Sequence, residues 1–139
     1  MFEEVTPAEF ERVVGRLLVA EGFTVRVPPS RGVDVGVDLF AIDPSRGETW
    51  AVQIKHFRRL RVHSGAMLRA VASQVIASQL IAEAERALLV VNIDFPPAAL
   101  EKIAKFGDIT IWDASMLRDV MTRQGCERAS CRTYRCTSR

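Results

Sequence analysis

The sequence predicts an α/β domain in which helices flank both faces of a mixed central sheet. Three observations support this fold class. Residues 36–42 and 49–55 alternate like two strands around the turn sequence "DPSRGE". The run "RALLVVNI" is continuously apolar, as in a strand buried on both faces. Strands and helices then alternate toward the C-terminus, which favours parallel pairing there. The predicted element order is αβββαβαβα.

The N-terminal segment carries a helix start signal. Thr6 can cap the helix, Pro7 suits its first turn, and Glu9 completes a capping box. One apolar face follows, formed by Phe10, Val13, Val14, Leu17 and Leu18. Gly22 ends the helix. The alternating "FTVRV" after it predicts a first strand.

The second half of the chain supplies the remaining elements. The segment "SGAMLRAVASQVIASQLIAEAE" repeats with a helical period and predicts a long helix. The following elements are a strand at 86–93, a helix at 96–107 that begins with proline, a strand at 108–113 and a helix at 114–122. Asp113 is a candidate helix cap before the last of these.

Composition favours one folded domain over residues 1–124, followed by a basic tail over 125–139. Of all residues, 48% are hydrophobic and 26% are charged, which excludes a disordered chain. The tail has a net charge of +3 out of a total of +2, so residues 1–124 carry −1. Bulk charge therefore does not argue for nucleic-acid binding.

All three cysteines lie in this tail, at positions 126, 131 and 136. Their spacing matches no familiar zinc pattern, so we expect a poorly ordered tail instead of a metal knuckle. The acidic N-terminus does not look like a signal peptide, and no uninterrupted apolar run approaches the roughly 18 residues of a membrane span. We expect a cytoplasmic protein.

The hairpin carries polar residues at positions that ought to be apolar. If the turn centres between residues 45 and 46, antiparallel partners sum to 91. Asp38 then lies opposite Gln53, and Lys55 lies on the same face because strand side chains alternate. The other face is filled by Val37, Leu39, Val52 and Ile54. Buried charges are costly without partners, so this grouping predicts a functional site.

The first helix offers a second acid. At about 100° per residue, Glu11 falls on the rim of the apolar face, beside Leu18. It can reach the hairpin or remain a solvated helix residue. Carboxylate and amide oxygens from Asp38, Gln53 and Glu11 suit Mg²⁺, for which Mn²⁺ often substitutes. A nearby lysine, Lys55, can stabilise charge that develops at phosphorus.

These motifs, "EF-E…GF-V…GVDVGVDLFA…AVQIKHF", resemble the catalytic domain of Mrr-type restriction endonucleases, in the Gln-x-Lys variant of the PD-(D/E)xK nuclease superfamily. The resemblance covers about residues 6–122. It implies a restriction-endonuclease-like three-layer fold and Mg²⁺-dependent hydrolysis of DNA. Asp38 matches the motif aspartate, Gln53 takes the place of the commoner acid, Lys55 is the motif lysine, and Glu11 matches the helix-one glutamate. Val37 replaces the proline. Asp34 could compete with Asp38 as the ligand.

A basic cluster follows the second hairpin strand. Arg58, Arg59 and Arg61 lie in "KHFRRLRVH" with His56, and we expect them to contact DNA phosphates instead of forming a merely solvated segment. A lone nuclease domain would need a homodimer or a partner for DNA specificity. The sequence predicts restriction-type DNA defence; a junction resolvase-like nuclease and a catalytically inactive DNA-binding or assembly module are the alternatives.

Overall fold

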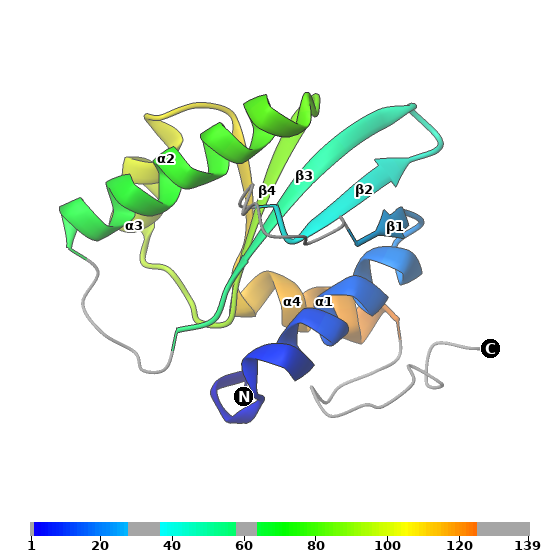
Figure 1. The fold of residues 1–139 in the computed structure, drawn as a ribbon. Coiled ribbons are helices and arrows are strands. Elements are labelled where there is room, and N and C mark those ends of the chain that lie inside the picture. The colour runs from blue at the N-terminus through cyan, green and yellow to red at the C-terminus, as the bar shows by residue number, and fades with distance from the viewer. Residues whose placement is uncertain (1, 28–36, 58–63, 125–139) are drawn as a thin grey trace.

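The computed structural model describes residues 2–27, 37–57 and 64–124 (Figure 1). Within these ranges five strands form one sheet in the order β1-β2-β3-β4-β5. Their bounds are β1 Thr24–Arg26, β2 Leu39–Asp43, β3 Glu48–Lys55, β4 Arg86–Val91 and β5 Ile109–Trp112. The first two pairs are antiparallel and the last two are parallel, so the mixed sheet is confirmed.

In the described part of the chain four α-helices cover the sheet, and a short 3-10 helix precedes them at Phe2–Glu4. Their bounds are α1 Pro7–Ala20, α2 Gly65–Ala82, α3 Pro97–Ala104 and α4 Ala114–Arg123. In Figure 1, α1 and α4 lie on one side of the sheet and α2 and α3 on the other. The α/β order αβββαβαβα and the three layers agree with the restriction-endonuclease-like fold that the sequence predicts.

Local sequence signals account for the helix starts. Thr6 accepts a hydrogen bond from the backbone of Glu9, and the Glu9 side chain accepts one from the backbone of Thr6. This reciprocal pair is the predicted capping box. Ser64 and Asp113 cap α2 and α4 through bonds to the third residue beyond each.

The predicted elements differ from the observed ones at their ends. The predicted strand 36–42 is observed as Leu39–Asp43, with residue 36 outside the described ranges. The helix predicted at 64–85 ends at Ala82, because Glu83 adopts a left-handed conformation with φ 56° and turns the chain into β4. The helix predicted at 96–107 ends at Ala104. The 3-10 helix was not predicted.

Two apolar cores lie on the two faces of the sheet. One joins α1 and α4 to Leu39, Val52, Ile54 and their neighbours. The other joins α2 and α3 to Leu89, Val91 and theirs. Because side chains alternate along β3, the odd-numbered positions 53 and 55 face the α2 layer while Val52 and Ile54 face α1.

One element, α2, also has the length and apolar character of a membrane span, with a mean hydropathy of 1.2 over 18 residues. Length and composition alone are weak evidence, since a helix from a folded core meets the same criterion. In this fold α2 packs with Leu68, Val71 and Val75 against the sheet.

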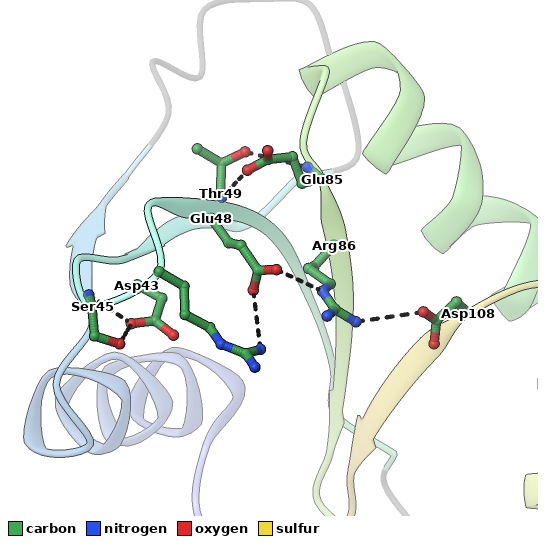
Figure 2. A network of polar contacts seen from close by, with 8 residues as sticks. Asp43, Ser45, Glu48, Thr49, Glu85, Arg86 and Asp108 are labelled. Carbon is green, nitrogen blue, oxygen red and sulfur yellow. Dashed lines mark hydrogen bonds and ion pairs between the residues drawn. The ribbon is translucent and has the colours of Figure 1, made fainter.

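A polar network fixes the turn end of the sheet (Figure 2). Arg86, at the start of β4, pairs with Glu48 of β3 at 3.4 Å and with Asp108, next to β5, at 3.5 Å. Thr49 and Glu85 exchange backbone-to-side-chain hydrogen bonds at 2.9 and 3.2 Å. The network therefore holds three strands in register at this end and leaves the opposite end of β3 for the polar hairpin residues.

Candidate active site

Asp38 lies immediately before β2 and is held by the facing strand. Its backbone N–H donates to the carbonyl of Val52 at 3.0 Å. Its Oδ2 accepts from the backbone N–H of Ile54 at 2.7 Å and from Nε2 of Gln53 at 3.2 Å. The observed pairs Leu39↔Val52 and Phe40↔Ala51 have the predicted register. The structure thus brings Asp38 and Gln53 together as the turn sequence indicates.

Gln53 is a buried amide near the C-terminal end of β3, with 5% of its surface exposed. Its Oε1 lies 3.1 Å from Oγ of Ser78, a buried residue on α2. The amide is therefore held from two sides, by the Asp38 carboxylate and by a hydroxyl from the covering helix. Ser78 is a contact that the sequence analysis missed. Its signal was a serine at the inward-facing position of an apolar helix.

Lys55 is the last residue of β3 and lies two positions beyond Gln53 on the same face. It is half-buried, and its backbone is in parallel register with Val91. The strand thereby directs the Lys55 side chain to the face of the sheet that carries Gln53, at the C-terminal end of β3. This follows from strand alternation and the observed register.

Glu11 is brought toward the hairpin by α1. Burial raises the pKa of the Glu11 carboxyl above its ordinary value, and the negative charge of Asp38 raises it further. The carboxylates of Glu11, on α1, and Asp38, before β2, therefore interact electrostatically. A nearby like charge disfavours ionisation, and a cation between the two would reverse that effect.

His56 lies on the opposite side of the strand from Lys55. Its Nε2 is 2.7 Å from the carbonyl oxygen of Val5, and its ring packs edge-on against Phe10 at 5.7 Å between centroids. This placement gives His56 a packing role between β3 and the N-terminal segment. The three arginines predicted to contact phosphates, Arg58, Arg59 and Arg61, lie outside the described residues, as does Asp34.

Asn92 fixes the chain just after β3 and was not predicted. It is 1% exposed. Its Oδ1 accepts from the backbone N–H of Phe57 at 2.6 Å, and its Nδ2 donates to the carbonyl of the same residue at 2.9 Å. These two bonds extend the β3–β4 pairing by one side chain beyond Lys55. The end of the strand that carries the lysine is thereby anchored to β4.

Comparison with protein families shows to which family the chain belongs. The model of the Mrr catalytic domain, described as a restriction endonuclease, matches residues 2–121. The chain belongs to the Mrr catalytic-domain family. The match covers α1, the hairpin and every element through most of α4, so this Mrr domain is a nuclease domain of the restriction-endonuclease type.

Among solved structures, the Mrr domain is similar to one described as "Crystal Structure of Protein of Unknown Function AF1548". The TM-score is 0.57 at 15% identity, covering 82% of this chain and 67% of that chain. At that identity the likeness concerns the fold alone. A comparison with curated proteins gives no match.

The residues of this Mrr domain fit a divalent cation that prefers oxygen ligands. Asp38 and Glu11 offer carboxylates, and the charge of Asp38 disfavours ionisation of Glu11. Gln53 has an amide oxygen, which faces Ser78 in this structure and would have to turn toward Asp38 to bind the same ion. Among the described residues no group of three or more His, Cys, Asp and Glu side chains could hold a metal. The set of donors here is therefore two acids and one amide, a composition suited to Mg²⁺ with water or phosphate completing the coordination.

Proposed function

We propose that this Mrr domain is a metal-dependent endonuclease that hydrolyses phosphodiester bonds of double-stranded DNA in restriction-type defence. The observation that supports this most strongly is the contact between Asp38 and Gln53. It joins an acid and an amide at the position where β2 meets β3, with Lys55 on the same face and Glu11 electrostatically coupled to Asp38. Family membership supplies the reaction class, and this grouping supplies residues capable of it.

In this proposal Asp38, Gln53 and Glu11 hold Mg²⁺, with Mn²⁺ as a substitute. When bound, the ion would supply positive charge against the reacting phosphate. The backbone N–H of Ile54 holds the Asp38 carboxylate in place at 2.7 Å, which reduces the reorganisation needed on binding. Of the three hairpin residues Asp38, Gln53 and Lys55, only Asp38 carries a full negative charge.

Lys55 is assigned to the transition state. Water attacks phosphorus, a new P–O bond forms and the bond to the leaving sugar oxygen breaks. The attacking water releases one proton, and the leaving oxygen takes one up. Negative charge grows on the phosphoryl oxygens during this step. The ammonium group of Lys55, at the end of β3, stabilises that charge, an effect typically worth about 100- to 1,000-fold in rate.

Binding of DNA is assigned to the arginines that follow β3. Arg58, Arg59 and Arg61 would neutralise phosphates and position the duplex without reading its sequence. His56 would join them only by giving up its contact with Val5. Sequence, modification or shape preference would then come from a homodimer or a partner.

The test is incubation of the chain with supercoiled plasmid, linear duplex and branched DNA in Mg²⁺, Mn²⁺ or EDTA. We expect cleavage of plasmid and linear duplex with either ion and none in EDTA. Cleavage restricted to branched substrates would favour a junction resolvase-like activity. Full activity in EDTA, or no activity with any substrate, would contradict the proposal.

A further inference from the structure

The Gln53 amide lies between two partners that place different demands on its orientation. On one side its Nε2 faces Oδ2 of Asp38 at 3.2 Å, as an ionised carboxylate requires. On the other side its Oε1 faces the hydroxyl of Ser78 at 3.1 Å. If Gln53 is to ligate a cation beside Asp38, its oxygen has to point toward Asp38 and its NH₂ group toward Ser78.

Ser78 is suited to both arrangements because its hydroxyl also contacts the backbone of Gln74. Its Oγ lies 2.8 Å from the backbone carbonyl of Gln74, one helical turn earlier. A hydroxyl has a single hydrogen, so Ser78 can donate to Gln53 or to Gln74, and not to both at once. When the hydrogen goes to the Gln74 carbonyl, the oxygen of Ser78 is turned to Gln53 as an acceptor. In that state the Ser78 oxygen can accept a hydrogen bond only if the NH₂ group of Gln53 points toward it.

We propose that Ser78 is a positioning residue that allows the Gln53 amide to turn over when the cation binds. Without the ion, Gln53 donates to Asp38 and accepts from Ser78. With the ion, the amide oxygen becomes a ligand, its NH₂ group donates to Ser78, and Ser78 donates to Gln74. Every polar group of the amide keeps a partner in both states, which matters because Gln53 is 5% and Ser78 is 2% exposed.

This inference rests on the proposed metal dependence and adds a residue from outside the hairpin. It also explains how an amide serves at a position where the superfamily commonly has an acid. A carboxylate has two equivalent oxygens and needs no reorientation. An amide has one donor end and one acceptor end, so its second partner has to change roles with it.

The experiment follows the side-chain NH₂ signals of Gln53 by ¹⁵N–¹H NMR during Mg²⁺ titration, assigned by their loss in Gln53→Glu. Calorimetric titration with Mn²⁺ measures affinity in Ser78→Ala, in Ser78→Thr, which restores a hydroxyl, and in Ser73→Ala. Ser73 is exposed on the same helix and serves as the matched control. No cleavage assay enters the readout.

In the wild type we expect Mg²⁺ to shift the Gln53 NH₂ signals to a saturating new position. Ser78→Ala should weaken Mn²⁺ binding about 10-fold, Ser78→Thr should recover most of it, and Ser73→Ala should not change it. Signals that stay in place while the wild type binds metal would overturn the role of Ser78 alone, as would wild-type affinity in Ser78→Ala. Absence of metal binding by the wild type would overturn the proposed function as well.

Discussion

At position 11 an acid sits where the fold penalises its charge. Burial and the charge of Asp38 both raise the pKa of the Glu11 carboxyl, so the ionised form is less favourable in the folded chain than in the unfolded one. The sign of the effect follows. The penalty is absent well below pH 4.5, grows as the pH rises from there, and is complete once the pH exceeds the raised pKa. A residue that costs stability in this way is a candidate for function.

Glu11→Gln should therefore have opposite effects with and without metal. In EDTA at pH 7 the variant should unfold at a slightly higher temperature than the wild type, by an amount equivalent to no more than about 1 kcal/mol, because Glu11 remains partly solvated. With Mn²⁺ its gain in melting temperature should be smaller than that of the wild type, since a ligand charge is lost. Thermal unfolding followed by circular dichroism measures both.

The matched control is Glu101→Gln, which removes an exposed acid from α3. It should leave the metal-induced gain in melting temperature unchanged. A Glu11→Gln variant that gains as much from Mn²⁺ as the wild type would remove Glu11 from the site.

The positions of single hairpin residues were largely predictable, but the residues from other elements that contact them were not. Asp38 and Gln53 face each other because the turn sequence fixes the register, which is local information. Ser78 contacts Gln53 across 25 residues, and His56 contacts Val5 across 51. No periodicity encodes such pairs. The only local sign of Ser78 is a polar residue on the buried face of α2.

At the scale of elements, the end of β3 depends on β4. Asn92 takes the place of a further strand residue by binding both backbone groups of Phe57. This contact follows Lys55 by two residues and precedes the arginine-rich segment. A polar residue directly after the apolar "LLVV" run was the available signal, but its partner lies 35 residues earlier.

Replacing Asn92 should loosen this end of the strand. Asn92→Ala removes a buried donor and acceptor and should lower the free energy of unfolding by about 1–3 kcal/mol. Asn92→Asp keeps the acceptor but sets a negative charge toward the Phe57 carbonyl, so it should destabilise at least as much. Urea unfolding measures the loss, and hydrogen exchange at the Phe57 amide should accelerate. Unchanged exchange at that amide in Asn92→Ala would show that the two hydrogen bonds between Asn92 and Phe57 do not stabilise this end of β3.

The ends of elements were the least predictable part of the fold. The predicted caps Thr6 and Asp113 gave two helix starts well, because they act through bonds within one turn. Ser64, predicted as the first helical residue, is observed as the cap of α2. The ends of α2 and α3 were placed too late. For α2 the reason is that Glu83 leaves the helix in a left-handed conformation that favours glycine or asparagine instead of glutamate. The sequence offered no such residue at that point.

At the scale of the whole molecule, the described structural polar network and the proposed site lie at opposite ends of the hairpin. The network of Glu48, Arg86 and Asp108 ties the turn end to β4 and β5 (Figure 2). At the turn itself, hydrogen bonds from the Ser45 side chain and backbone lower the pKa of the Asp43 carboxyl. The other end carries Asp38, a residue whose charge conflicts with that of Glu11. The turn end of the hairpin is held by ion pairs, and the end with Asp38 has unfavourable electrostatics. This is the arrangement expected of a site supported by a stable sheet.

The basic segment after β3 should act through phosphates. Replacing Arg58 and Arg59 with alanine should weaken binding to all duplex sequences alike and reduce the log–log salt slope by about one unit per lost contact. Fluorescence anisotropy across a salt series measures both. The control replaces Arg46 and Arg123, which pair with Glu48 and Glu21. An unchanged slope in the Arg58 and Arg59 variant would show that these arginines do not contact DNA phosphates.

The most direct test of the account combines Mn²⁺ calorimetry with plasmid nicking for the wild type, Asp38→Ala, Lys55→Ala and the exposed control Lys105→Ala. Asp38→Ala should lose metal binding and cleavage together. Lys55→Ala should bind metal at least as well as the wild type, because a nearby cation is gone, yet cleave about 100- to 1,000-fold more slowly. Lys105→Ala should behave like the wild type. Cleavage by Lys55→Ala at the wild-type rate would contradict the assignment of this hairpin as a nuclease site.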